Sequence, residues 1–133
     1  MRVIPTNFNI RSDSGPNTFS RGLFKNLSDH HGVELSNVVE ESDIEFSLIE
    51  SPIERTIPRI TRLDGIYFNT SQDFNLLNKN IKRTYENSDS VVFQSNFNKM
   101  LISEWFGEHN LGKVILNGAN TDQIKNIPVA QMT

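Results

Sequence analysis

Helix-like stripes and short apolar runs alternate along this sequence, and the alternation limits the folds that the chain can adopt. One stretch shows the pattern most clearly, because four apolar residues recur there at helical spacing: Phe74, Leu77, Ile81 and Tyr85. A continuous apolar run at residues 91–93 follows, and such a run is typical of a strand that is covered on both faces. Strand-like and helix-like segments in alternation favour a parallel sheet with helices packed against it.

Nine elements are predicted in the order β-α-β-β-β-α-β-α-β. We expect strands at residues 2–7, 33–39, 44–49, 59–63, 91–93 and 114–116, and helices at residues 16–30, 74–85 and 96–106. The pattern therefore predicts an α/β fold with an open, doubly wound, mostly parallel sheet of about six strands and helices on both faces.

Several residues are predicted to cap these helices or to pack them against the core. Thr70 and Asp73 resemble a capping box before the second helix, and Ser95 is expected to cap the third. Gly32 and Gly107 are expected to end the first and the third helix. The third helix is expected to pack three side chains, spaced by four residues, into the core: Phe97, Leu101 and Trp105.

The composition excludes several kinds of site and partner. The 133 residues suit one domain, and the absence of cysteine excludes disulfides and thiolate zinc sites. A net charge of −3 argues against a nucleic-acid partner, which usually requires a basic face. No run approaches the roughly 20 apolar residues of a membrane span, so we expect no membrane span and a cytoplasmic location. There is also no D-x-D arrangement of the kind that holds a divalent cation with a nucleotide diphosphate.

Doubly wound sheets bind ligands beyond the carboxyl ends of their strands. Four predicted loops lie at that edge, at residues 9–17, 64–70, 94–97 and 117–120. These loops carry the most distinctive polar residues of the chain, so we expect the functional site to be built from them.

The first loop carries three candidate binding residues, Ser14, Gly15 and Asn17. Gly15 leaves room for a ligand to approach the backbone, and the free N–H groups at a helix start favour phosphate or another anion. A turn followed by a helix cap explains the same residues, and both interpretations stay open.

Arg62 and Asp64 end the predicted strand at residues 59–63. An arginine binds an anionic group through two parallel hydrogen bonds, and a carboxylate accepts a proton or orients a hydroxyl. We predict both as catalytic residues, against the alternative that the pair only positions the turn. Tyr67 follows in the same loop, where its ring is placed to stack on a sugar.

Ser95 and Asn117 complete the candidate substrate-binding residues. Helix capping explains Ser95 more simply than ligand binding does. Asn117 and Gly118 are typical of an ordinary turn, and they become informative only in the context of the whole set of motifs.

That set resembles a known family. The segments RLDGIYFN at residues 62–69, YENSDSVVFQS at 85–95, WFG at 105–107 and VILNGAN at 114–120 resemble the N-terminal half of family 4-like GT-B glycosyltransferases. The segment SGPNTF at residues 14–19 is similar to the loop after the first strand in that family. The resemblance implies a Rossmann-like, acceptor-side domain over residues 1–120 that takes part in sugar transfer from a nucleotide-activated sugar, without a metal or other cofactor.

The same resemblance implies roles for the candidate residues. Gly15 and its neighbours would face the donor diphosphate, Arg62 and Asp64 would lie near the reaction centre or the acceptor, and residues 117–120 would lead toward a second domain. Many family members have a His after the fourth strand, where this chain has Leu63 and Asp64.

Residues 121–133 form the predicted C-terminal tail, where a linker to that second domain would begin. The family's donor-binding domain and its pair of Glu with seven residues between them do not occur in this sequence. We therefore expect the chain to be inactive alone, and to act with a separately encoded donor-binding domain or as a homo-oligomer. The expected ligands are a sugar acceptor and, once the second domain is present, a nucleotide-sugar donor.

Two other functions were weighed. A non-catalytic binding module derived from a glycosyltransferase is the alternative to sugar transfer. A single-domain response receiver also suits the length, but the first strand ends in Thr6 and Asn7, without the acidic pair that a receiver needs.

Overall fold

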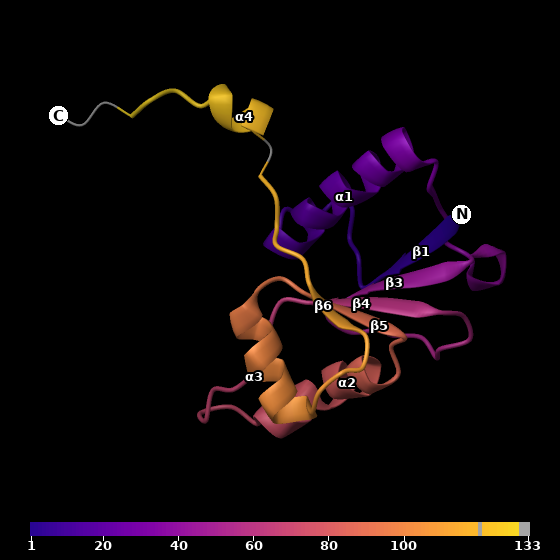
Figure 1. The fold of residues 1–133 in the computed structure, drawn as a ribbon, viewed down its shortest axis with the longest axis vertical. Coiled ribbons are helices and arrows are strands. Elements are labelled where there is room, and N and C mark those ends of the chain that lie inside the picture. Colours follow the sequence, from indigo (N-terminus) through magenta and orange to yellow (C-terminus); the bar gives the residue numbers. More distant parts are fainter. Residues whose placement is uncertain (120, 131–133) are drawn as a thin grey trace.

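The computed structural model of the chain describes residues 1–119 and 121–130. Asn120, at the end of the predicted loop 117–120, and residues 131–133 of the predicted tail lie outside the described residues. Within the described residues, six strands form one sheet in the order β2-β1-β3-β4-β5-β6, and all neighbouring strands are parallel (Figure 1). The predicted α/β fold, with a Rossmann-like doubly wound sheet, is confirmed.

The elements lie close to their predicted positions. The strands are β1 (Arg2–Thr6), β2 (Glu34–Leu35), β3 (Ile44–Leu48), β4 (Arg59–Leu63), β5 (Ser90–Phe93) and β6 (Gly112–Val114). The helices are α1 (Gly15–His31), α2 (Phe74–Glu86), α3 (Asn96–Phe106) and the short α4 (Thr121–Lys125), with a 3-10 turn η1 (Val39–Glu41).

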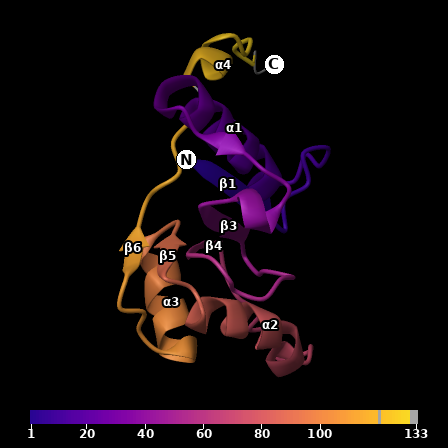
Figure 2. The same ribbon diagram turned by 90° about the vertical axis from the view of Figure 1, so that its right-hand side faces the viewer.

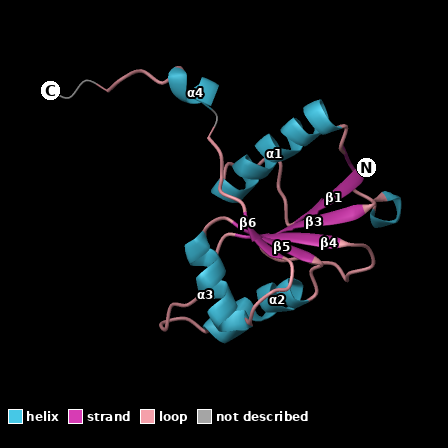
Figure 3. Ribbon diagram, viewed as in Figure 1, coloured by secondary structure: helices cyan, strands magenta, loops and turns pink. Residues whose placement is uncertain are grey.

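The helices form layers on both faces of the sheet. α1 lies on one face, and α2 and α3 lie on the other (Figures 2 and 3). The chain runs from β1 through α1 to β2, then returns past β1 to β3 and continues outward to β6. β1 and β3 are therefore neighbours whose connections run in opposite directions, and doubly wound sheets bind ligands at such a switch point. In the described residues, no helix has the length and apolar composition needed to cross a membrane.

Two apolar clusters hold these layers together. Val3, Phe24 and Val33 form the cluster between α1 and the sheet. The larger cluster lies between the sheet and α2 and α3: Leu63, Ile66, Ile81, Tyr85, Val91, Phe93 and Ile102. Because successive side chains of a strand point to opposite faces, Val92 faces α1 while its two neighbours join the larger cluster.

A buried ion pair joins β3 to the start of β4. Glu45 and Arg59 form an ion pair of 2.6 Å between Oε2 and Nε, and both side chains are buried. The other carboxylate oxygen, Oε1, accepts hydrogen bonds from the hydroxyls of Thr6 (2.6 Å) and Ser51 (2.5 Å). Arg59 also donates from Nη2 to the carbonyl of Ile53 at 2.9 Å. This network ties β1, β3, β4 and the loop after β3 together.

The two edge strands end earlier than predicted. β2 ends at Leu35, not at residue 39, and η1 follows. β6 covers Gly112–Val114 instead of residues 114–116, and Leu116 of the predicted strand is 70% exposed. The physical reason is the same at both edges. An edge strand has one neighbour, and its apolar residues remain exposed where no helix covers them.

The predicted helix ends are confirmed except at the start of α2. The hydroxyl of Ser95 accepts a hydrogen bond from the N–H of Asn98 at 3.1 Å, and Gly107 ends α3 with a φ of 89°. At α2 the capping-box prediction is wrong, because Asp73 is itself the cap and accepts from the N–H of Leu76 at 3.1 Å. Asp73 directly precedes the first helical residue, so its carboxylate reaches the N–H of Leu76 in the first turn.

α3 is also rotated relative to the prediction. Phe97 is 62% exposed and Trp105 is 41% exposed, so the prediction that both pack in the core is wrong. Ile102 is fully buried instead, and Leu101 packs against the same cluster. Trp105 lies edge-on to Phe74 of α2, with ring centres 5.2 Å apart. This contact between the two helices orients α3 with Ile102 toward the sheet.

Candidate functional site

Four polar side chains from three neighbouring strands meet at the carboxyl edge of the sheet. Arg62 is on β4, Asp64 follows β4, Gln94 follows β5, and Asn117 lies three residues beyond β6. Parallel strands end at the same edge, which is why residues separated by up to 55 positions come into contact. Three of the predicted site residues, Arg62, Asp64 and Asn117, are thus brought together.

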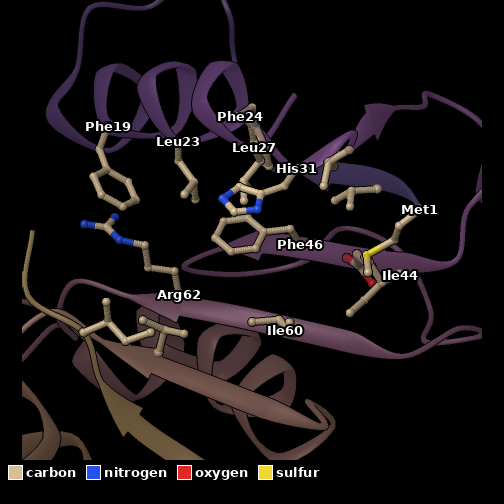
Figure 4. A pocket seen from close by; sticks show the side chains of 15 residues that line it. Met1, Phe19, Leu23, Phe24, Leu27, His31, Ile44, Phe46, Ile60 and Arg62 are labelled. Carbon is tan, nitrogen blue, oxygen red and sulfur yellow. The ribbon is translucent and has the colours of Figure 1, made fainter. Parts of the chain in front are cut away.

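Arg62 is the centre of this group, and its side chain is only 3% exposed. Its Nη1 lies 2.6 Å from Oδ1 of Asp64 in an ion pair. Its Nη2 donates to Oδ1 of Asn117 at 3.0 Å and to Oε1 of Gln94 at 3.4 Å. The guanidinium also lies 3.9 Å from the centre of the Phe19 ring, which stands over it from α1 (Figure 4). Arg62 therefore links α1, β4 and the segment after β6.

The ion pair between Arg62 and Asp64 brings the charges together without aligned hydrogen bonds. Nη1 of Arg62 and Oδ1 of Asp64 are both buried, and neither makes a hydrogen bond of good geometry within the described residues. The two atoms lie against each other out of contact with solvent, so the attraction between their opposite charges offsets part of the cost of burying them.

A neighbouring arginine lowers the pKa of a carboxyl, but the pKa of Asp64 is shifted in the opposite direction. Burial raises the pKa of Asp64 above its ordinary value, and this effect outweighs the opposing attraction of the Arg62 charge. Its backbone carbonyl accepts hydrogen bonds from Asn98 Nδ2 at 2.7 Å and Gln94 Nε2 at 3.3 Å. The turn is thus held rigidly by α3 and β5, while the carboxyl group stays partly open to solvent.

The candidate residues at the start of α1 contact one another. Asn17 donates from Nδ2 to the hydroxyl of Ser14 at 2.8 Å, and its Oδ1 accepts from the N–H of Asn9 at 2.9 Å. The side chain of Ser14 makes no capping hydrogen bond, and a Cβ on Gly15 would meet nothing within 4 Å. The first turn of α1 has no acidic residue to compensate the positive end of the helix, and Pro16 within it has no N–H to donate.

The backbone of Tyr67 and the hydroxyl of Ser95 form hydrogen bonds with residues outside the Arg62 cluster. The backbone N–H of Tyr67 donates to Oδ1 of Asn78 at 2.8 Å, and its carbonyl accepts from Nδ2 of the same residue at 2.6 Å. These bonds hold the Tyr67 loop on α2 and leave the ring exposed. The Ser95 hydroxyl is used in capping α3, as the simpler of its two interpretations predicts.

Sequence reasoning missed Gln94 and Phe19 as members of the site. Gln94 directly follows the apolar run of β5, and that position at the carboxyl edge was the available signal. Phe19 belongs to the apolar stripe of α1, so the sequence offered no reason to separate it from core residues.

The switch point between β1 and β3 carries two residues with left-handed backbone. Asn7 has a φ of 55° and Ile49 a φ of 68°, and the side chain of Asn7 donates to the carbonyl of Leu48 at 2.7 Å. This conformation is unfavourable for a β-branched residue such as Ile49, and backbone strain of this kind concentrates at functional sites. The strain lies at the edge that carries Arg62.

In the described residues, His, Asp and Glu side chains do not gather in groups of three that would hold a metal ion. Comparison of the chain with protein-family models, with curated proteins and with solved structures finds no match. The structure therefore establishes a Rossmann-like α/β fold with a polar cluster around Arg62 at its carboxyl edge, and the glycosyltransferase resemblance stays a prediction.

Proposed function

We propose that this chain forms the acceptor side of a sugar-transfer crevice of the GT-B type and works with a donor-binding domain. The observation that supports this most is the meeting of Arg62, Asp64 and Asn117 at the carboxyl edge of three adjacent parallel strands. These are three residues of the motifs that resemble the family, and they come from segments far apart in the sequence.

Asp64 is the proposed base that accepts the proton of the acceptor hydroxyl. A carboxyl with a raised pKa is closer to the acidity at which proton transfer is efficient near neutral pH. Arg62 balances the charge of the carboxylate and, through Asn117, connects it to the segment after β6. Tyr67, which is exposed in the loop after Asp64, is the proposed stacking surface for a sugar ring.

The donor diphosphate is proposed to lie at the start of α1. Ser14, Gly15 and Asn17 lie at the positive end of this helix, with open space beside Gly15. A half crevice neither encloses the donor nor excludes water, so positioning and electrostatic stabilisation require the second domain.

The test combines this chain with candidate donor-binding domains supplied in trans, a panel of nucleotide sugars and a panel of acceptors. We expect sugar transfer with one combination, and about a 10²- to 10⁴-fold lower kcat for Asp64→Asn, because the general base is lost. Asp29→Asn, an exposed carboxylate on α1, is the matched control and leaves kcat unchanged. An absence of turnover with every combination would contradict the proposal.

A non-catalytic binding module is the second candidate, and the commitment of Arg62 to internal contacts favours it. An arginine that is already bound to Asp64, Asn117 and the ring of Phe19 also suits a purely structural role. Acceptor or protein binding that survives both Arg62→Ala and Asp64→Ala would support this candidate. Loss of both binding and transfer in the same variants would support the enzyme.

A further inference from the structure

A groove runs between α1 and the sheet, on the side of α1 that faces β4 and β5. Phe24 of α1 packs with Val3 of β1, but Ile60 of β4 and Val92 of β5 face the helix across an open space of about 520 Å³ (Figure 4). Of the helices in the described residues, α1 alone lies against this face of the sheet. The groove is therefore a part of the sheet that the fold leaves uncovered.

Apolar side chains line the groove along the length of α1. Phe19, Leu23 and Leu27 line it from the helix, and Figure 4 shows Arg62 beneath Phe19 at one end and His31 toward the other. From Phe19 to His31 the helix rises by about 18 Å, at 1.5 Å per residue. The groove thus offers an apolar path of about that length.

The segment after β6 carries exposed apolar side chains. Each residue of 115–119 and 121–130 is exposed, and α4 has no buried residue. Five apolar side chains in this segment are between 54% and 92% exposed: Ile115, Leu116, Ile124, Ile127 and Val129. One chain therefore carries both an open apolar groove and an exposed apolar segment.

Residues 126–130, with the sequence NIPVA, match the groove in charge and in length. The run has no charged side chain, and Pro128 favours an extended backbone at Ile127 before it. Five extended residues span roughly 16 Å at about 3.3 Å per residue, close to the length of the groove. Glu45, which also lines the groove, is fully buried and paired with Arg59, so it presents no free charge to this run.

Within one copy, α1 separates α4 from the groove. Figures 1 and 2 both show α4 on the far side of α1 from the strands. The chain passes the outer flank of α1 on the way, where Gly118 and Gln123 face Gly22 and Asn26 across a second hollow. The segment therefore runs away from its own groove, whereas the groove of another copy is not behind a helix of the same chain.

We propose that the groove beside α1 binds residues 124–130 of a second copy of this chain, and that two copies exchange these segments reciprocally. A two-fold symmetric exchange fills both grooves and leaves neither segment exposed. Asn117 lies between β6 and the exchanged residues, so the dimer also anchors the segment that binds Arg62. The exchange involves no sugar and no donor-binding domain, and it is independent of the proposed function.

The area of this exchange reaches what a specific dimer needs. Full burial of an aliphatic side chain removes roughly 60–120 Å² from water. The five exposed side chains of each segment, together with the groove surfaces that they cover, bury on the order of 1,200 Å² in the dimer. That area is at the lower end of the range for specific interfaces, so we expect the dimer to form in the micromolar range of protein concentration.

The test measures the mass of the full chain in solution against concentration, by sedimentation. NMR on a mixture of isotope-labelled and unlabelled copies then locates the contact. We expect a monomer–dimer equilibrium, and nuclear Overhauser effects between copies that join the methyl groups of Ile127 and Val129 to those of Leu23 and Val92.

Ile127→Asp introduces a charge into the exchanged segment. We expect it to raise the dissociation constant of the dimer at least about 10-fold, because the carboxylate would be buried among apolar side chains. Ile127 is 63% exposed and belongs to neither apolar cluster, so its substitution leaves the core of the monomer intact. Leu76→Asp is the matched control, since Leu76 is 66% exposed on α2 and lies across the sheet from the groove.

A mixture of two variants separates exchange between copies from closure within one copy. Leu23→Trp fills the groove but keeps the segment, whereas Ile127→Asp keeps the groove but alters the segment. Each variant alone is expected to dimerise at least about 10-fold more weakly than the wild type. Mixed together, they should associate more tightly than either alone, because the intact segment of the first enters the intact groove of the second.

The inference is overturned if the chain stays monomeric throughout the micromolar range, or if Ile127→Asp dimerises as tightly as the wild type. A monomer whose own Ile127 contacts Leu23 would show closure within one copy and would also overturn it. So would a dimer whose contacts lie at the exposed Phe97 and Met100 of α3, or a mixture that associates no better than its components. Sugar transfer by a strictly monomeric chain counts against this inference alone, and a dimer that never supports transfer counts against the proposed function alone.

Discussion

The guanidinium of Arg62 lies 3.9 Å from the centre of the Phe19 ring, and this contact joins α1 to the carboxyl edge of the sheet. The ring covers the arginine on one side while Asp64 and Asn117 bind it through its nitrogen atoms. Phe19 thereby covers one face of the guanidinium, and both residues line the groove beside α1. The geometry makes Phe19 a positioning residue for Arg62.

Replacing Phe19 by Leu keeps an apolar side chain and removes the aromatic face. We expect the free energy of unfolding to fall by about 1 kcal/mol, because the cation–π attraction of a largely desolvated arginine is lost. Urea denaturation measures the change. Phe97→Leu, at an exposed position on α3, is the control and should differ from the wild type by less than half as much.

Asp64 should titrate above the ordinary carboxyl value of about 3.9. Burial raises its pKa and the charge of Arg62 lowers it, so Arg62→Gln should raise the pKa of Asp64 further. A carboxyl ¹³C titration by NMR measures both values. A wild-type pKa below 3.9, or a decrease in the Arg62→Gln variant, would show that burial is not the dominant cause.

The raised pKa of Asp64 has a defined consequence for stability. A carboxyl whose pKa is higher in the folded than in the unfolded state contributes most to folding below the unfolded pKa. That contribution is lost as the pH rises through the folded pKa, so the free energy of unfolding should decline over this window. The same decline should be missing from Asp64→Asn when unfolding is measured across the acidic range.

The buried ion pair between Glu45 and Arg59 should respond very differently to single and double substitution. Glu45→Gln leaves the charge of Arg59 buried and unpaired, and should cost about 3–5 kcal/mol in the free energy of unfolding. Adding Arg59→Met removes the stranded charge, so the double variant should lose less than the sum of the two single losses. Chemical denaturation of the four chains measures the coupling, and additive losses would argue against it.

Two glycines should respond in opposite directions to alanine. A Cβ on Gly112 would lie 2.8 Å from Cε2 of the buried Phe93 ring, so Gly112→Ala should cost about 1–3 kcal/mol through overpacking. Gly22 lies within α1 with open space around it, so Gly22→Ala should add about 0.5–1 kcal/mol through helix propensity. Thermal or urea unfolding of both variants checks the signs, and equal signs would contradict the argument.

Local pattern predicted much of the fold. The spacing of Ile81 and Tyr85 indicated α2, the apolar run around Val92 indicated β5, and Ser95 and Gly107 marked the two ends of α3. These features depend on residues within a few positions of one another. A sequence displays such relationships directly, because helix and strand periodicity and capping are local.

Which side chains are buried, and which pair with one another, depended on contacts between segments that are distant in the sequence. The exposure of Phe97 follows from the packing of Trp105 on Phe74, and the early ends of β2 and β6 follow from their places at the edges of the sheet. Glu45 stands among apolar strand residues with no local sign that Arg59 and Thr6 would pair with it. Such features depend on strand order, which periodicity does not specify.

By itself, the sequence determined that this chain forms an α/β sheet and that Arg62 and Asp64 stand at the end of one of its strands. Only the tertiary structure decided that Asn117, Gln94 and Phe19 join them, and that a groove opens beside α1. The physical reason is that secondary structure follows from neighbours along the chain. A site and a cavity follow instead from the register and spacing of elements that meet only after folding.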